Sequence, residues 1–124
     1  MSEADELLDQ ARTRLKEAEA LLQAGLYEGA VSRSYYAAFS AARAMLAADG
    51  TRTKTHRGVI QQFGKSFVRS GMAEVRLGRG LAQLHRRREL ADYGTGHAIV
   101  KAEADSSVAL ATDMVQAAAR YIGQ

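Results

Sequence analysis

Hydrophobic and polar positions follow a helical period along almost the whole chain. Apolar side chains recur every three to four residues in five stretches separated by breaks that contain glycine, and this spacing predicts five α-helices. The second stretch, residues 27–48, has no charge from 34 to 42 and is apolar on most sides, which is typical of a central helix. We therefore predict an all-α fold, an up-and-down four-helix bundle with a fifth shorter helix, in a single domain spanning residues 1–124.

The breaks between the five stretches contain residues that end or begin helices. We place the breaks at Gly25, 49–50, 70–71 and 93–96. Glycine is suited to the left-handed conformation that ends many helices, and Thr53 or Thr55 could accept a hydrogen bond at the start of the third helix. The fourth helix is then expected over residues 72–91, and His97 is expected on the surface where the fifth begins.

Composition narrows the class of protein. The chain has no proline and no cysteine, so disulfides and thiolate chemistry are excluded. No apolar run approaches the roughly 20 residues that a membrane span needs, and the acidic first residues do not resemble a signal peptide. We therefore expect a cytoplasmic protein that is not bound to a membrane.

Charge is distributed unevenly along the chain. The net charge of +3 divides into −3 for residues 1–50, +9 for 51–88 and −3 for 89–124. A basic middle segment could attract phosphate groups. It could equally be a solvated face that the acidic terminal helices balance, and the sequence leaves both interpretations open.

Arg88 interrupts the apolar stripe of the predicted fourth helix. Asp92 lies one turn later, where a carboxylate can neutralise a half-buried arginine. The pair could be a structural ion pair or a clamp for a nucleotide phosphate, with Arg33 of the second helix as a second arm. Tyr36 follows Arg33 by three residues and shares its face, beside small residues that could admit a base or only another helix.

Histidines are the candidates for acid–base chemistry. His85 precedes Arg88 by three residues, so His85, Arg88 and Asp92 share one helical face. His56 falls on the inner face of the third helix, where a histidine is commonly a core or capping residue. No spacing of histidines or acids suggests a metal site, and no glycine-rich phosphate loop is present, so we predict neither metal nor cofactor.

Three segments together resemble one known family. The run Tyr27–Leu46 resembles the central helix of HEPN-domain proteins, Lys54–Ile60 resembles their third helix, and Arg88–Tyr93 resembles the signature of their fourth. The resemblance implies a bundle of four to five helices, usually a homodimer, often encoded beside a minimal nucleotidyltransferase. Members of the family act as RNases in toxin–antitoxin systems or as partners of that nucleotidyltransferase.

The catalytic branch of the family carries an arginine followed after four to six residues by a histidine, and a metal-independent site forms across the dimer. Arg79 and His85 have this spacing, but six steps of 100° place them on different faces of one helix. The signature at Arg88 has no such histidine.

The resemblance leaves three hypotheses about function. The first is a toxin-like module that binds nucleotide or RNA through Arg33, Tyr36, Arg88 and Asp92 and acts with a nucleotidyltransferase, for which Tyr93 is a possible acceptor of modification. The second is a metal-independent RNase at a dimer cleft, using His85 or His56 with Arg79 or Arg88. The third is a helical interaction module without a ligand.

Overall fold

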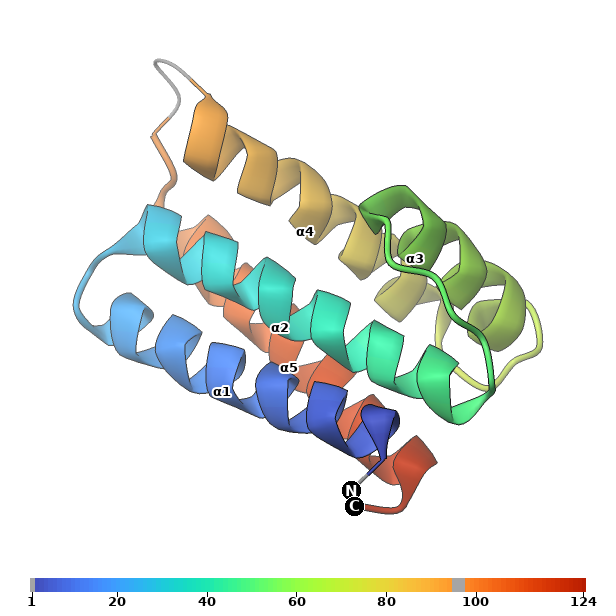
Figure 1. Cartoon of the computed structure of the whole chain (residues 1–124). Helices are drawn as coiled ribbons and strands as arrows, with labels where there is room; N and C mark the ends of the chain where they lie inside the picture. Colours follow the sequence, from blue (N-terminus) through green and yellow to red (C-terminus); the bar gives the residue numbers. More distant parts are fainter. Residues whose placement is uncertain (1, 95–97) are drawn as a thin grey trace.

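The computed structural model describes residues 2–94 and 98–124 of the chain. Its described part is all-α, as predicted, and contains five α-helices and one short π-helix (Figure 1). The helices are α1 (Glu3–Gln23), α2 (Tyr27–Ala48), α3 (His56–Phe63), α4 (Val75–Tyr93) and α5 (Lys101–Ile122), with the π-helix η1 (Gly64–Val68) directly after α3.

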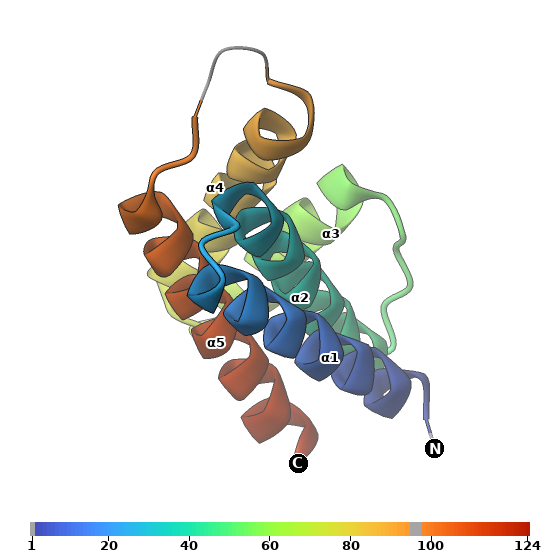
Figure 2. The same cartoon turned by 90° about the vertical axis from the view of Figure 1, so that its left-hand side faces the viewer.

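Four long helices form the up-and-down bundle, and the short α3 packs at one side of it. The central helix is α2, which contacts α1, α3, α4 and α5 and lies between them in two perpendicular views (Figures 1 and 2). The start of α1 and the end of α5 lie at the same end of the bundle (Figure 1). There the side-chain amide of Gln124 donates a hydrogen bond to the Asp5 carboxylate.

The composition of α2 explains its central position. Of its 22 residues, 14 are buried, most of them alanine or serine. Small side chains let the neighbouring helices approach closely, while Tyr35, Phe39 and Met45 fill the remaining space between them. The absence of charge from 34 to 42 therefore reflects burial on nearly all sides.

Most predicted helix boundaries are confirmed. The turn after α1 uses Gly25 at φ +77°, a conformation that glycine adopts without strain. Of the two candidate caps, Thr55 acts at α3, where its hydroxyl accepts a hydrogen bond from the Gly58 amide at 3.0 Å. The predicted turn after α4 falls partly on residues 95–97, including His97, which lie outside the described residues.

Two boundaries differ from the prediction. The third helix changes at Gly64 into the π-helical turn η1, which keeps both Phe63 and Phe67 buried with ring centroids 5.6 Å apart. The fourth helix begins at Val75 and not at Met72, which is exposed in the connection that precedes it. In the described part of the chain, no helix has the length and apolar character to cross a membrane.

Candidate functional site

Arg88 lies among aromatic rings between α2 and α4. It occupies a buried position on the stripe of α4 that Leu77, Leu81 and Leu84 also form, and only 9% of its side chain is exposed. Its guanidinium carbon lies 5.5 Å from the ring centroid of Tyr35, 5.3 Å from that of Tyr36 and 5.8 Å from that of Tyr93. These distances fall within the range of about 6 Å at which aromatic rings attract a cation, so three rings replace part of the lost hydration.

We use the name Arg88 cluster for Arg88, the three tyrosines around it and the polar side chains that contact these residues. Its members are Tyr35, Tyr36, His56, His85, Arg88, Glu89, Asp92 and Tyr93.

The carboxylate of Asp92 is the counterion within the cluster. Asp92 Oδ2 lies 3.9 Å from Arg88 Nε, too far for a hydrogen bond, and Arg88 Nε has no hydrogen-bond partner among the described residues. The same oxygen accepts a hydrogen bond from Ser32 Oγ at 3.3 Å. The charge of Arg88 is therefore opposed, while its Nε is a buried donor without a hydrogen-bond partner among the described residues.

Two histidines meet beside the arginine. The rings of His56 at the start of α3 and His85 in the middle of α4 stack with centroids 5.6 Å apart. His85 Nδ1 lies 3.3 Å from Glu89 Oε1, and this contact orients the imidazole ring. The side chain of His85 is 28% exposed, so the histidine pair is open to solvent.

The hydroxyl of Tyr35 links α2 to α3. It lies 2.5 Å from His56 Nδ1, and burial raises the pKa of Tyr35 well above its usual range. The pKa of His56 is lowered, chiefly by its burial and then by the nearby Arg88 guanidinium and His85 imidazole. At neutral pH the phenol is therefore protonated and the imidazole of His56 is neutral, so Tyr35 can donate to Nδ1 and hold the ring in place.

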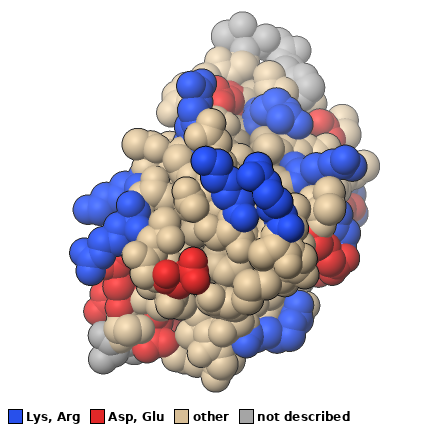
Figure 3. Space-filling model, turned by 90° about the vertical axis from the view of Figure 1, so that its right-hand side faces the viewer, with Lys and Arg blue, Asp and Glu red and all other residues tan. Residues whose placement is uncertain are grey.

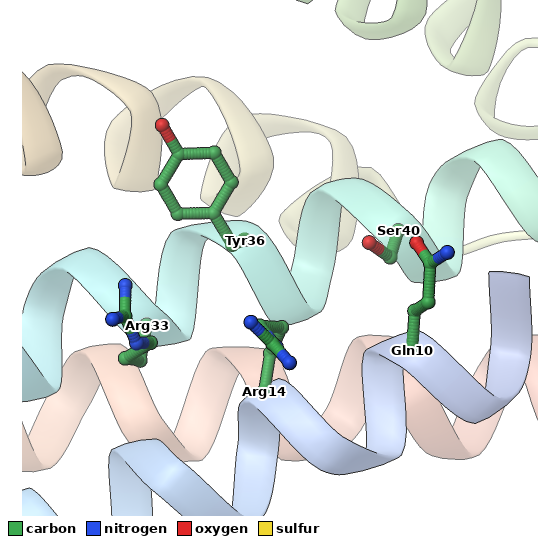
Figure 4. A pocket seen from close by; sticks show the side chains of 5 residues that line it. All are labelled: Gln10, Arg14, Arg33, Tyr36 and Ser40. Atoms are coloured by element: carbon green, nitrogen blue, oxygen red, sulfur yellow. The ribbon is translucent and has the colours of Figure 1, made fainter.

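A separate pocket of about 590 Å³ lies between α1 and α2. It is lined by Gln10, Arg14, Arg33, Tyr36 and Ser40 (Figure 4). Arg33 Nε lies 3.2 Å from Glu17 Oε1 of α1, whereas the contacts of Arg88 are to the tyrosines and Asp92. Tyr36 is the residue that this pocket shares with the Arg88 cluster.

The predicted site residues are thus divided between two places. Tyr36, His85, Arg88, Asp92 and Tyr93 come together in the Arg88 cluster, while Arg33 lines the pocket against α1.

Among the described residues, no contact places Arg79 in the Arg88 cluster or in the pocket. It is exposed on the continuous helix α4, on a different face from His85.

Sequence reasoning did not find several residues of these sites, among them Gln10 and Arg14 of the pocket. Tyr35 was not a candidate, because the apolar character of the central helix does not show where a hydroxyl points. Glu89 could have been found, since it lies four residues after His85 on the same helix. Glu17 could not, because the sequence does not say which residues of the first helix face Arg33.

The face of the molecule on the side of α3 is basic. A view from the side of α3 shows lysine and arginine side chains more prominently than acidic ones (Figure 3), in agreement with the charge of +9 on residues 51–88. Across residues 2–94 and 98–124, histidine and acidic side chains form no group of three that could hold a metal ion.

Comparison with known proteins agrees with the resemblance found in the sequence. The family model of the HEPN domain matches residues 4–121. The UPF0332 protein glr0978 of Gloeobacter violaceus is 33% identical over 123 residues, 98% of each chain. A protein of Methanocaldococcus jannaschii named "Putative toxin MJ0605" is 39% identical over 75% of this chain and 69% of its own length.

A solved structure shares the fold. The crystal structure of TT1696 from Thermus thermophilus superposes with a TM-score of 0.82 over 98% of this chain and 99% of that one, at 21% sequence identity. The family match covers nearly the whole chain, and the observed helices are those that the resemblance implied. This chain belongs to the HEPN domain family.

Proposed function

We propose that this protein is a toxin-like HEPN module whose Arg88 cluster binds a phosphate and a base of a nucleotide or RNA. The observation that carries the proposal is a buried guanidinium that is surrounded by three tyrosine rings and has an unpaired Nε donor. A structural ion pair would bring its carboxylate into hydrogen-bond range, yet Asp92 Oδ2 stays 3.9 Å away.

The chemistry of the cluster suits such a ligand. Arginine recognises phosphate oxygens through several parallel donors, and Tyr93, which is 73% exposed, offers a ring on which a base can stack. The basic face on the side of α3, the helix that begins at His56, would draw in a polyanion (Figure 3). Related proteins carry the name of putative toxin, which supports the toxin-like role.

The partner in this proposal is a minimal nucleotidyltransferase, and the active form is a homodimer, both as the family resemblance implies. Tyr93 is the proposed acceptor of modification, because its exposed hydroxyl adjoins the site and a group added there would cover Arg88. Intact-mass measurement after incubation with the nucleotidyltransferase encoded nearby and ATP tests this point. A Tyr93→Phe protein that gains the same mass would contradict it.

A specific observation favours a second function, cleavage of RNA without a metal. His56 and His85 stack beside Arg88. Because the Tyr35 hydroxyl already occupies Nδ1 of His56, the partly exposed His85, whose Nδ1 faces Glu89, is the candidate base. In such a reaction the base takes the proton of the ribose 2′-OH, whose oxygen attacks phosphorus. The bond between phosphorus and the 5′-oxygen then breaks, that oxygen takes up the proton held by the base, and Arg88 opposes the charge on the phosphorane.

One set of measurements separates the hypotheses. The melting temperature of the protein is followed with a nuclease-resistant RNA and with mononucleotides, all in EDTA. We expect it to rise with RNA, because a ligand that binds only the folded state stabilises it. If no nucleotide or RNA raises it, the protein is a helical interaction module without such a ligand.

Activity is then tested on unmodified RNA. Cleavage in EDTA that disappears in His85→Ala establishes the RNase, and intact RNA under all conditions removes that alternative. For the toxin-like role, induced expression should slow growth, and co-expression of the nucleotidyltransferase should restore it. Unimpaired growth on expression of the protein alone would contradict that role.

A further inference from the structure

The pocket between α1 and α2 has the size and the groups of a ligand site. Its volume of about 590 Å³ lies in the range of about 300–1,000 Å³ found for ligand pockets. Two guanidinium groups, from Arg14 and Arg33, lie along it with the ring of Tyr36, the hydroxyl of Ser40 and the amide of Gln10 (Figure 4). The pocket therefore offers several hydrogen-bond donors and one aromatic ring, a combination that suits an anion with a ring of its own.

The two arginines share a single carboxylate. Arg14 Nε and Arg33 Nε each lie 3.2 Å from the same oxygen, Glu17 Oε1. One negative charge therefore opposes two positive charges, and the pocket keeps a net positive charge.

The contacts to Glu17 are made by charge and not by well-directed hydrogen bonds. Arg14 Nε and Glu17 Oε1 are shielded from solvent, yet neither makes a hydrogen bond of acceptable geometry with the described residues. Both contacts also use Nε, which leaves the terminal nitrogens of each guanidinium group for another acceptor. A phosphate, with several oxygens and a full negative charge, fits that role better than one shared carboxylate oxygen.

The position of Tyr36 connects this pocket to the proposed site. Its ring lies 5.3 Å from the guanidinium carbon of Arg88 and also lines the pocket that holds Arg14 and Arg33. One aromatic residue therefore connects the cation of Arg88 with the two arginines of the pocket. A single-stranded nucleic acid has the same order of groups, because a base lies between successive phosphates and stacks readily on an aromatic ring.

We propose that the α1–α2 pocket binds the next nucleotide of a single-stranded RNA that is held at the Arg88 cluster, with Arg14 and Arg33 on its phosphate. The inference rests on the proposed function and specifies its ligand: an RNA strand occupies both places, whereas a mononucleotide reaches one. When no RNA is bound, the Glu17 carboxylate contacts both arginines. It therefore competes with the phosphate for them.

The test is fluorescence anisotropy with a labelled hexauridylate whose 2′-hydroxyls are methylated, so that it cannot be cleaved. Arg14→Gln and Arg33→Gln are each expected to weaken binding about tenfold, the effect of losing one charge-assisted contact. Each should also reduce the slope of log K against log salt by about 0.7. Affinity for uridine monophosphate should change far less in both variants.

Arg12→Gln is the matched control, because Arg12 lies on the same helix but contacts the backbone oxygen of Gln124. It removes the same charge and is expected to bind RNA nearly as the wild type does. Glu17→Gln gives a change of the opposite sign: RNA binding should tighten, since the competing carboxylate is gone. An ion pair with a purely structural role would not produce that gain. Far-UV circular dichroism and melting temperature verify that each variant is folded.

The outcomes separate the inference from the proposed function. If the wild type binds the RNA but Arg14→Gln and Arg33→Gln behave like Arg12→Gln, the pocket proposal is wrong and the Arg88 site remains. If the wild type binds no RNA, both fail. If these variants weaken binding of the nucleotidyltransferase but not of RNA, the pocket docks a protein and the inference is overturned.

Discussion

The substitution Asp92→Asn measures how much the ion pair between Arg88 and Asp92 contributes to the free energy of unfolding. The two groups lie 3.9 Å apart, with 9% of the Arg88 side chain and 31% of the Asp92 side chain exposed. Asparagine keeps an oxygen that can accept the hydrogen bond from Ser32 Oγ, so the change removes a charge and little else. The gross Coulomb energy at this distance is about 4 kcal/mol at a protein surface, and desolvation offsets much of it.

We expect Asp92→Asn to lower the free energy of unfolding by about 1–2 kcal/mol at pH 7. That is less than the roughly 3–5 kcal/mol lost when one partner of a fully buried pair is removed. Asp92 is partly solvated, and three tyrosine rings remain around the Arg88 guanidinium. For 124 residues, a loss of about 1.5 kcal/mol corresponds to a fall in melting temperature of about 6 °C.

Asp105→Asn is the matched control. Lys101 and Asp105 have the same spacing of four residues along a helix and a shorter distance of 2.9 Å, but their side chains are 66% and 46% exposed. We expect almost no loss of stability, because water screens the pair.

Urea denaturation followed by circular dichroism gives both free energies of unfolding. If Asp105→Asn loses as much stability as Asp92→Asn, or if Asp92→Asn gains stability, burial does not control these ion pairs and the reasoning is refuted.

Three further predictions concern the neighbouring contacts. Tyr35→Phe should lower the free energy of unfolding by about 1 kcal/mol, because it removes the hydrogen bond to His56; an unchanged urea midpoint would contradict this. The folded-state pKa of His56 is lowered, so wild-type stability should fall as pH drops below about 6.5, the unfolded value; a His56→Gln variant with the same pH dependence would exclude this cause. Gly80→Ala should change the free energy of unfolding by less than about 1 kcal/mol, because the added carbon would meet only the flexible end of Leu110, at 2.8 Å from Cδ2, and alanine favours the helix; a loss of several kcal/mol would show that Leu110 cannot move aside.

Much of the fold followed from the sequence, because periodicity reports directly on which helix faces are buried. The bounds of α2 were predicted as residues 27–48, and Arg88 was correctly placed on the buried stripe of α4. The π-helical turn at Gly64 was not predicted, since the apolar spacing from Phe63 to Phe67 is the same in a continuous α-helix.

The site was less accessible to sequence reasoning, because it depends on how helices face one another. His56 and His85 were recognised as candidates, but their stacking arises only when α3 packs against α4. Arg33 was expected beside Arg88, whereas its contacts are with Glu17 of α1. Periodicity places a residue on a helix face without saying which neighbouring helix covers that face.

The position of Tyr36 has a thermodynamic consequence. A ligand that turns its ring alters the surroundings of Arg88 and of the α1–α2 pocket at the same time. Occupancy at one place must then change affinity at the other by a factor that is equal in both directions, since such coupling is reciprocal. If nucleotides bind at both places as proposed, one aromatic side chain of the central helix makes the two binding events interdependent.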